Sequence, residues 1–186
     1  MRKNFGVKTY LYPQPVLIVG TYDGEGRPNA MNAAWGGICD EDRIMISMSR
    51  HRTTENIAAT GAFTVSVGTA DQAAACDFVG VVSADRDPDK MRKSGFTAEK
   101  SEFVNAPLFR ELPLTLECEL DKILEDGYYV GRIVNVSADE RILGEDGKPD
   151  VRKLDPITFD TVHNRYIALG KTVGRAFRDG LALKDR

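Results

Sequence analysis

Two stretches decide the fold, Pro28-Asn29-Ala30-Met31-Asn32-Ala33-Ala34-Trp35 and Ser47-Met48-Ser49-Arg50-His51-Arg52-Thr53-Thr54-Glu55-Asn56. The small side chains of the first would let a planar ligand approach the backbone closely. The second places two serines, two threonines, two arginines and an asparagine within ten residues. Hydroxyl donors and fixed positive charge are what a phosphate dianion requires. Together the stretches indicate a binding slot for a flat ring beside a phosphate-binding site. They therefore predict a phosphorylated aromatic cofactor.

Strand and turn signals surround these stretches. An apolar run from Pro15 to Tyr22 is followed by the turn Asp23–Gly26, which predicts a hairpin with residues 28–35. Residues 43–49 alternate apolar with polar or small residues and predict a third strand. Thr53 is then expected to cap a short helix that reaches Ala59 and stops at Gly61. A phosphate bound there would meet free backbone N–H groups and the positive end of the helix dipole.

The rest of the chain continues the β-rich pattern. The predicted elements are a strand at 62–67, helices at 71–79 and 87–94, strands at 114–124 and 128–138, a turn at 144–147 and a last strand near 161–169. Six or more antiparallel strands with small helices fit a closed barrel, but the periodicity does not distinguish a barrel from a sandwich.

Simpler interpretations compete with the binding site. On the residues alone, Asn29 and Trp35 are more readily an ordinary turn residue and a core tryptophan. The hydroxyls of residues 47–54 could belong to a solvated loop that caps a helix. The density of donors, with no acid before Glu55, favours a phosphate instead.

Short motifs follow one another along nearly the whole chain. They are Pro13-Gln14-Pro15-Val16-Leu17-Ile18-Val19-Gly20-Thr21, Asp23-x-x-Gly26-x-Pro28-Asn29-Ala30-Met31, Ala34-Trp35-Gly36-Gly37, Ser47-x-Ser49-Arg50-x-x-Thr53-x-x-Asn56-Ile57, Ala75-Cys76-Asp77-x-x-Gly80, Asp89-Lys90, and Tyr166-x-x-Leu169-Gly170-x-x-x-Gly174-x-Ala176-Phe177. Each motif has modest specificity. Their order and spacing resemble the flavin reductase-like, FMN-binding split-barrel family, particularly its flavoredoxin branch.

The resemblance implies a mainly β (α+β) fold, an antiparallel split β-barrel of Greek-key type with short flanking helices, spanning residues 1–186 as one domain. It implies FMN as cofactor and a homodimer with FMN near the subunit boundary. The predicted cofactor-binding residues are Asn29, Ala33, Ala34, Trp35, Ser47, Met48, Ser49, Arg50, Thr53, Thr54 and Lys90. Lys90 is included only because of the resemblance, since a lysine in a short helix is otherwise expected to be solvated.

Composition excludes several classes of function. Lys and Arg number 25 against 28 Asp and Glu, so the net charge of −3 gives no reason to expect a nucleic-acid partner. The apolar run at 16–19 is too short for a signal peptide or membrane span, and we expect a cytoplasmic protein. The three cysteines form no Cys-x-x-Cys pair, so no disulfide framework or metal site is expected. His51 and His163 do not assemble into a credible hydrolytic triad.

Two classes of function remain for a chain of this kind. The first is an NAD(P)H:flavin oxidoreductase, and the second is a non-enzymatic electron carrier with a small-molecule or redox-protein donor and acceptor. A haem- or flavin-binding module without turnover is a weaker third. No Gly-x-Gly-x-x-Gly follows a strand, so NADH or NADPH as reductant would have to dock directly over the flavin.

Overall fold

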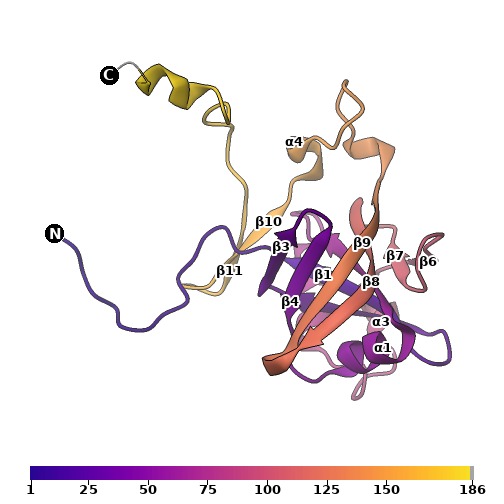
Figure 1. The fold of residues 1–186 in the computed structure, drawn as a ribbon. Helices are drawn as coiled ribbons and strands as arrows, with labels where there is room; N and C mark the ends of the chain where they lie inside the picture. Colours follow the sequence, from indigo (N-terminus) through magenta and orange to yellow (C-terminus); the bar gives the residue numbers. More distant parts are fainter. Residues whose placement is uncertain (185–186) are drawn as a thin grey trace.

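A seven-stranded antiparallel sheet curls into an open barrel in the computed structural model, which describes residues 1–184 (Figure 1). In spatial order its strands are β2 (Pro28–Ala33), β1 (Leu17–Tyr22), β5 (Ala62–Val67), β8 (Leu114–Leu124), β9 (Tyr128–Ala138), β4 (Arg43–Ser47) and β3 (Gly36–Asp40). β2 and β3 are therefore the two edges of the sheet, and only residues 34–35 separate them in sequence. The short connection brings the two edges together at one corner of the barrel.

Both faces of the sheet are buried where β1 crosses the molecule. Leu17 and Val19 point into the barrel and pack with Phe63, whereas Ile18 points outward and packs with Phe109. Successive side chains of a strand alternate between faces, so an unbroken apolar run supplies two cores at once. Full burial of one such side chain contributes about 1.5–3 kcal/mol.

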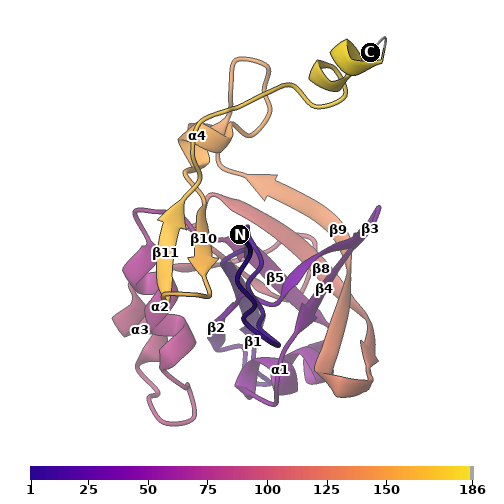
Figure 2. The same ribbon diagram turned by 90° about the vertical axis from the view of Figure 1, so that its left-hand side faces the viewer.

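The outer core is covered by helices and a separate hairpin. α2 (Ala73–Val81) and α3 (Lys90–Ser94) lie on one side of the sheet, and the hairpin of β10 (Ile157–Asp160) and β11 (Arg165–Ala168) stands beside α2 (Figure 2). The remaining elements are α1 (Arg52–Thr60), the two-stranded sheet of β6 (Ala98–Lys100) and β7 (Pro107–Phe109), α4 (Val151–Leu154), and 3₁₀ turns at 125–127, 140–142 and 179–183. None of the helices within residues 1–184 is both long and apolar enough to cross a membrane.

Most of the predicted elements are confirmed, as is the mainly β fold built on an open, antiparallel barrel. The strands at 62–67, 114–124 and 128–138 have the predicted bounds, and Gly61 ends α1 in the left-handed conformation with φ +68°. α2 begins at Ala73 rather than Asp71, because the Asp71 carboxylate accepts the Thr69 hydroxyl instead of capping the helix.

Two predictions at the element level are wrong, and one strand was missed. Thr53 does not cap α1. His51 precedes the helix, and its backbone N–H donates to the Thr54 hydroxyl at 2.9 Å. Residues 161–164 form a turn rather than the start of the last strand, because Asp160 accepts the backbone N–H of Val162 at 3.0 Å and folds the chain back. β3 was not predicted at all.

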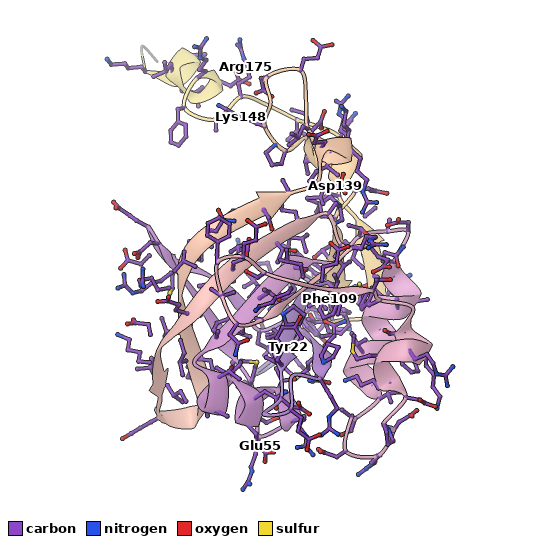
Figure 3. The ribbon with its side chains drawn as sticks, turned by 90° about the vertical axis from the view of Figure 1, so that its right-hand side faces the viewer. Tyr22, Glu55, Phe109, Asp139, Lys148 and Arg175 are labelled. Atoms are coloured by element: carbon purple, nitrogen blue, oxygen red, sulfur yellow. The ribbon has the colours of Figure 1, made fainter. Side chains whose placement is uncertain are left out.

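Both ends of the chain extend away from the barrel (Figures 1 and 2). Phe177 in the C-terminal segment is 99% exposed. Figure 3 shows Lys148 and Arg175 in outlying segments, whereas Phe109 lies inside the body. The N-terminal segment is attached to the hairpin through Asp160, a carboxylate only 2% exposed that accepts the hydroxyl of Tyr12.

Candidate functional site

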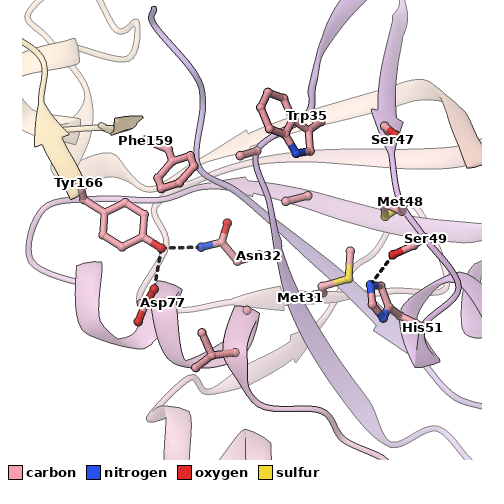
Figure 4. Close-up of a pocket in the computed structure, with 14 residues that line it drawn as sticks. Met31, Asn32, Trp35, Ser47, Met48, Ser49, His51, Asp77, Phe159 and Tyr166 are labelled. Atoms are coloured by element: carbon pink, nitrogen blue, oxygen red, sulfur yellow. Dashed lines mark hydrogen bonds between the residues drawn. The ribbon is translucent and has the colours of Figure 1, made fainter. Parts of the chain in front are cut away.

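A cavity of about 470 Å³ lies where the two edges of the sheet approach each other (Figure 4). We call it the slot. Its lining residues are Met31, Asn32, Ala33, Ala34, Trp35, Ser47, Met48, Ser49, His51, Asp77, Gly80, Val81, Phe159 and Tyr166. Its volume falls within the range usual for small-molecule sites.

The connection between β2 and β3 forms one wall of the slot. Ser47 at the end of β4 donates its backbone N–H to the Trp35 carbonyl at 2.8 Å, and the Gln14 side chain donates to the Ala34 carbonyl. These bonds fix residues 34 and 35 from both sides. The small side chains of Ala33 and Ala34 leave the wall flat, and Trp35 remains 46% exposed at its rim. A flat apolar wall suits an aromatic ring.

The opposite wall is polar and joins three elements. Tyr166 of β11 donates its hydroxyl to Asp77 Oδ1 of α2 at 2.8 Å, and Asn32 Nδ2 of β2 lies 3.4 Å from the same hydroxyl oxygen. Asn32 also donates to the Cys76 carbonyl at 3.0 Å. A Cβ on Gly80 would lie 2.9 Å from Asn32 Cβ, so only glycine allows α2 to pack this closely on β2. Burial, together with the bond to Asp77, raises the pKa of Tyr166 and keeps its hydroxyl protonated.

A second cavity of about 430 Å³ adjoins the slot and shares Met31, Asn32, His51, Gly80 and Val81 with it. We call it the Lys90 cavity. Its other lining residues are Asn29, Arg52, Thr53, Val79, Val82, Ser83, Ala84, Asp85, Arg86 and Lys90.

The Lys90 ammonium is buried without a paired carboxylate. Lys90 is 4% exposed, and among the described side chains, which do not include that of Asp126, no acid lies within ion-pair distance of its Nζ. Burial lowers the pKa of Lys90 to about 8, although Asp85 opposes this shift. A buried cation without a partner is costly, so the position is suited to an anionic ligand.

Asn29 provides a second indication of a ligand in the Lys90 cavity. Its Nδ2 donates to the Thr53 hydroxyl at 2.8 Å, whereas its buried Oδ1 receives no hydrogen bond from residues 1–184. Buried polar atoms are almost always paired, so an acceptor left free indicates a missing donor. A ligand that carries both hydroxyl groups and an anion would satisfy Asn29 Oδ1 and Lys90 together. The backbone N–H groups at the start of α1 add to the positive potential.

The structure divides the residues predicted from the sequence. Ala33, Ala34, Trp35, Ser47, Met48 and Ser49 line the slot, and Asn29, Thr53 and Lys90 line the Lys90 cavity. Arg50 and Thr54 line a third cavity, which shares Ser47, Met48 and Ser49 with the slot. The Arg50 side chain is 89% exposed and donates to Glu55 at 3.2 Å, while the Thr54 hydroxyl is engaged by His51. The ten-residue run therefore does not converge on one point, and the roles of its residues stay predictions.

Several lining residues were not selected from the sequence. Asp77 and Gly80 belong to a quoted motif, but α2 is too far along the chain for its position beside β2 to follow from spacing. No sequence pattern marked Phe159 as a binding residue, because it lies before the segment that was expected to form the last strand. His51 and Tyr166 were noted, and their place in the slot follows only from the fold.

Comparison with known proteins shows the family. The family described as "Flavin reductase like domain" matches residues 9–160, and this chain belongs to it. The flavoredoxin of Desulfovibrio vulgaris (Miyazaki F) is 37% identical, with 97% of this chain and 100% of that chain covered and a TM-score of 0.93. The flavoredoxin from Methanosarcina acetivorans is 26% identical, with 98% and 100% covered and a TM-score of 0.86.

A third solved structure is similar in fold alone. It is an FMN-binding domain of a flavin reductases-like enzyme from Shewanella baltica OS155, which is 20% identical, with 87% of this chain and 89% of that chain covered and a TM-score of 0.76.

Proposed function

We propose that this chain is an FMN-binding oxidoreductase that passes electrons from NADH or NADPH, through the flavin, to a second flavin or another acceptor. The observation that carries the proposal is the pair of adjoining cavities, one with a flat apolar wall, the other holding the unpaired Lys90 ammonium and the free Asn29 Oδ1. A phosphorylated, hydroxyl-bearing ring compound matches both cavities. The family to which the chain belongs supports the same choice.

The residues of the two cavities divide the work of holding FMN. Ala33, Ala34 and Trp35 would hold the ring, and Lys90 with Thr53 would hold the phosphate. When bound, FMN supplies the acceptance and release of hydride and electrons, and the protein supplies orientation and electrostatics. Tyr166 keeps its proton, and so it acts in the slot as a hydrogen-bonding group rather than as an anion.

Titration of the protein with FMN and with riboflavin tests the identity of the cofactor. We expect tighter binding of FMN than of riboflavin, because only FMN carries the phosphate that Lys90 would meet. Trp35 is the only tryptophan, and its position on the slot predicts strong quenching of its fluorescence by FMN. Equal affinity for the two flavins, or unchanged tryptophan emission at saturating FMN, would contradict the assignment of the two cavities.

Anaerobic mixing tests the reductase activity. The FMN-loaded protein is mixed with NADH or NADPH, and flavin absorbance is followed. Loss of the oxidised absorbance is expected, with a Michaelis constant toward the upper part of the usual range of about 1 μM to 1 mM, because no separate nucleotide-binding motif is present.

An electron-carrier function is the second candidate. The 37% identity and TM-score of 0.93 to a flavoredoxin favour it. Under this alternative the flavin stays oxidised with both nucleotides and is bleached by a reduced ferredoxin-type donor.

We also propose that the protein is a homodimer. The exposed apolar side chains of the C-terminal segment, including Val173 and Phe177, support this, because such side chains are usually covered by a partner. Light scattering should give twice the chain mass. A monomer that retains FMN at micromolar concentration would contradict the proposal.

A further inference from the structure

The slot has a marked charge asymmetry. Asp77 is the one carboxylate in its lining, and no lysine or arginine of residues 1–184 lines it. Asp77 is exposed to the cavity, and Figure 4 shows its carboxylate beneath the Tyr166 hydroxyl. The cationic groups lie instead in the adjoining cavity, where Arg52 is paired with Asp85 and Lys90 is buried.

The Asp77 carboxylate is held in place and keeps free acceptor capacity. Tyr166 occupies Oδ1, and Oδ2 receives no hydrogen bond from residues 1–184. Tyr166 is itself within reach of Asn32 on the edge strand β2. A carboxylate fixed in this way presents a constant negative charge and an open acceptor to anything that enters the slot.

We infer that Asp77 determines which redox partner reaches the ring. Neutral or cationic groups that donate an N–H, such as a primary carboxamide, are favoured, and anionic groups are repelled. Tyr166 is the positioning residue that aims Asp77. This inference rests on the proposed function, since the partner is taken to react with a flavin in the slot.

Two inorganic oxidants of opposite charge test the inference. Ferricyanide and hexaammineruthenium(III) each accept one electron, so two molecules of either oxidise one fully reduced FMN, whose two protons pass to water. Across about 10 Å of water a unit charge changes the local concentration of a trivalent ion by up to about ten-fold at low ionic strength. Asp77→Asn keeps the size of the side chain and removes its charge.

The kinetic readout is the ratio of the two reoxidation rates, measured by anaerobic stopped flow. Asp77→Asn should raise the rate with ferricyanide and lower that with hexaammineruthenium(III), changing the ratio several-fold. Glu102→Gln is the matched control, because it removes one charge from an exposed side chain in the loop between β6 and β7. Its ratio should remain close to that of the parent protein.

A second readout needs neither flavin nor turnover. Trp35 and Asp77 line the same cavity, so collisional quenching of Trp35 by iodide and by caesium reports the field in the slot of the cofactor-free full-length chain. The iodide-to-caesium ratio of quenching constants should rise about two-fold in Asp77→Asn and remain unchanged in Glu102→Gln. Tyr166→Phe should give an intermediate ratio, because Asp77 keeps its charge but loses its fixed direction.

The outcomes separate this inference from the proposed function. An unchanged quenching ratio in Asp77→Asn overturns the inference even where FMN binds normally. A parent protein that binds no FMN overturns the proposed function, while the quenching ratio still tests the charge of the slot. Where Asp77→Asn does not fold, Asp77→Ser and the parent protein are used. In the parent, the ratio of the hexaammineruthenium(III) rate to the ferricyanide rate should fall as salt is added, and a ratio that is insensitive to salt overturns the inference.

Discussion

At the scale of single residues, the buried ammonium of Lys90 makes ligand binding dependent on pH. In the cofactor-free protein the pKa of Lys90 is about 8, against 10.5 for an ordinary lysine. Between these values the unfolded chain binds more protons than the folded one, so stability of the cofactor-free protein increases with pH there. Under the proposed function, a bound phosphate dianion would reverse the preference and favour the charged lysine, so FMN binding above pH 8 should take up a proton.

The first prediction is that FMN affinity is highest between about pH 6, where the phosphate becomes a dianion, and pH 8, where Lys90 begins to lose its proton. Lys90→Met should lower affinity about ten-fold or more at pH 7 and remove the decline above pH 8, as measured by fluorescence titration. Arg50→Ala should have a smaller effect, because that side chain points to solvent.

Lys93→Met is the matched control, since Lys93 is exposed and pairs with Asp87 at 2.6 Å. Riboflavin binding should hardly respond to either lysine variant. A similar loss for riboflavin and FMN in Lys90→Met would show that Lys90 supports the fold rather than a phosphate.

A second prediction at this scale concerns the thiols. Burial raises the pKa of Cys76 to about 11 and that of Cys118 to about 12, and both side chains are inaccessible. Cys39 is exposed. A thiol reagent should therefore modify one cysteine per native chain and three after denaturation. Flavin reduction should persist in a Cys39→Ser variant, and a loss of flavin reduction in a folded variant would implicate a thiol in electron transfer.

The sequence indicated which residues line the candidate cavities, but not which of them line the same cavity. The small residues Ala33 and Ala34, the adjacent Trp35 and the hydroxyls at 47–53 were found because their types cluster along the chain. Arg50 and Thr53 are three residues apart and still line different cavities, because the chain turns into α1 between them. Lys90 came only from the family resemblance, since nothing in a local window shows that a helical lysine will be buried.

At the scale of elements, the β10–β11 hairpin depends on one carboxylate. The hydroxyl of Tyr12, as the largest cause, together with His163 and Arg165, holds the pKa of Asp160 well below its usual range, although burial opposes this. A depressed carboxyl pKa stabilises the fold at neutral pH, and this stability is lost as pH falls below the unfolded value of 3.8.

The third prediction is that Asp160→Asn lowers the melting temperature by a few degrees at pH 7, because the amide no longer accepts every donor that the carboxylate accepts. The difference from the parent should begin to shrink as the pH falls below 3.8, where the parent begins to lose the same contribution. FMN affinity should also fall, since Phe159 and Tyr166 of the hairpin line the slot. Asp179→Asn, which removes an exposed partner of Arg175, is the calorimetric control and should change neither quantity.

Long extended runs that end at turn residues were easiest to predict. β8 and β9 each run for eleven residues and are joined by the 3₁₀ turn that ends at Gly127, whose φ of +80° suits the turn. β3 escaped prediction because it begins with Gly36 and Gly37 and, apart from half-buried Gly36, is exposed along its length, so no alternation marks it. The turn after Asp160 arises from hydrogen bonds to that buried carboxylate, which the sequence pattern does not reveal.

At the scale of the whole molecule, the two cores share one sheet. Val19 contributes to the inner core and Ile18 to the outer core from adjacent positions on β1. Neither core can be lost without exposing the strands that support the other. The fourth prediction is one cooperative unfolding transition, coincident by tryptophan fluorescence and far-ultraviolet circular dichroism, as expected of a single domain over 1–186. Two separated transitions would divide the chain into independent units.

The wall contributed by β11 has a consequence for synthesis of the protein. Residues 33–35 and 47–51 of the slot are synthesised well before Tyr166. Because domains form progressively as the ribosome extends them, the barrel strands can pair while this side of the cavity is still missing. A nascent chain stalled before the hairpin would therefore have a nearly complete barrel that lacks one wall of the slot, and we expect it to retain a slot ligand poorly.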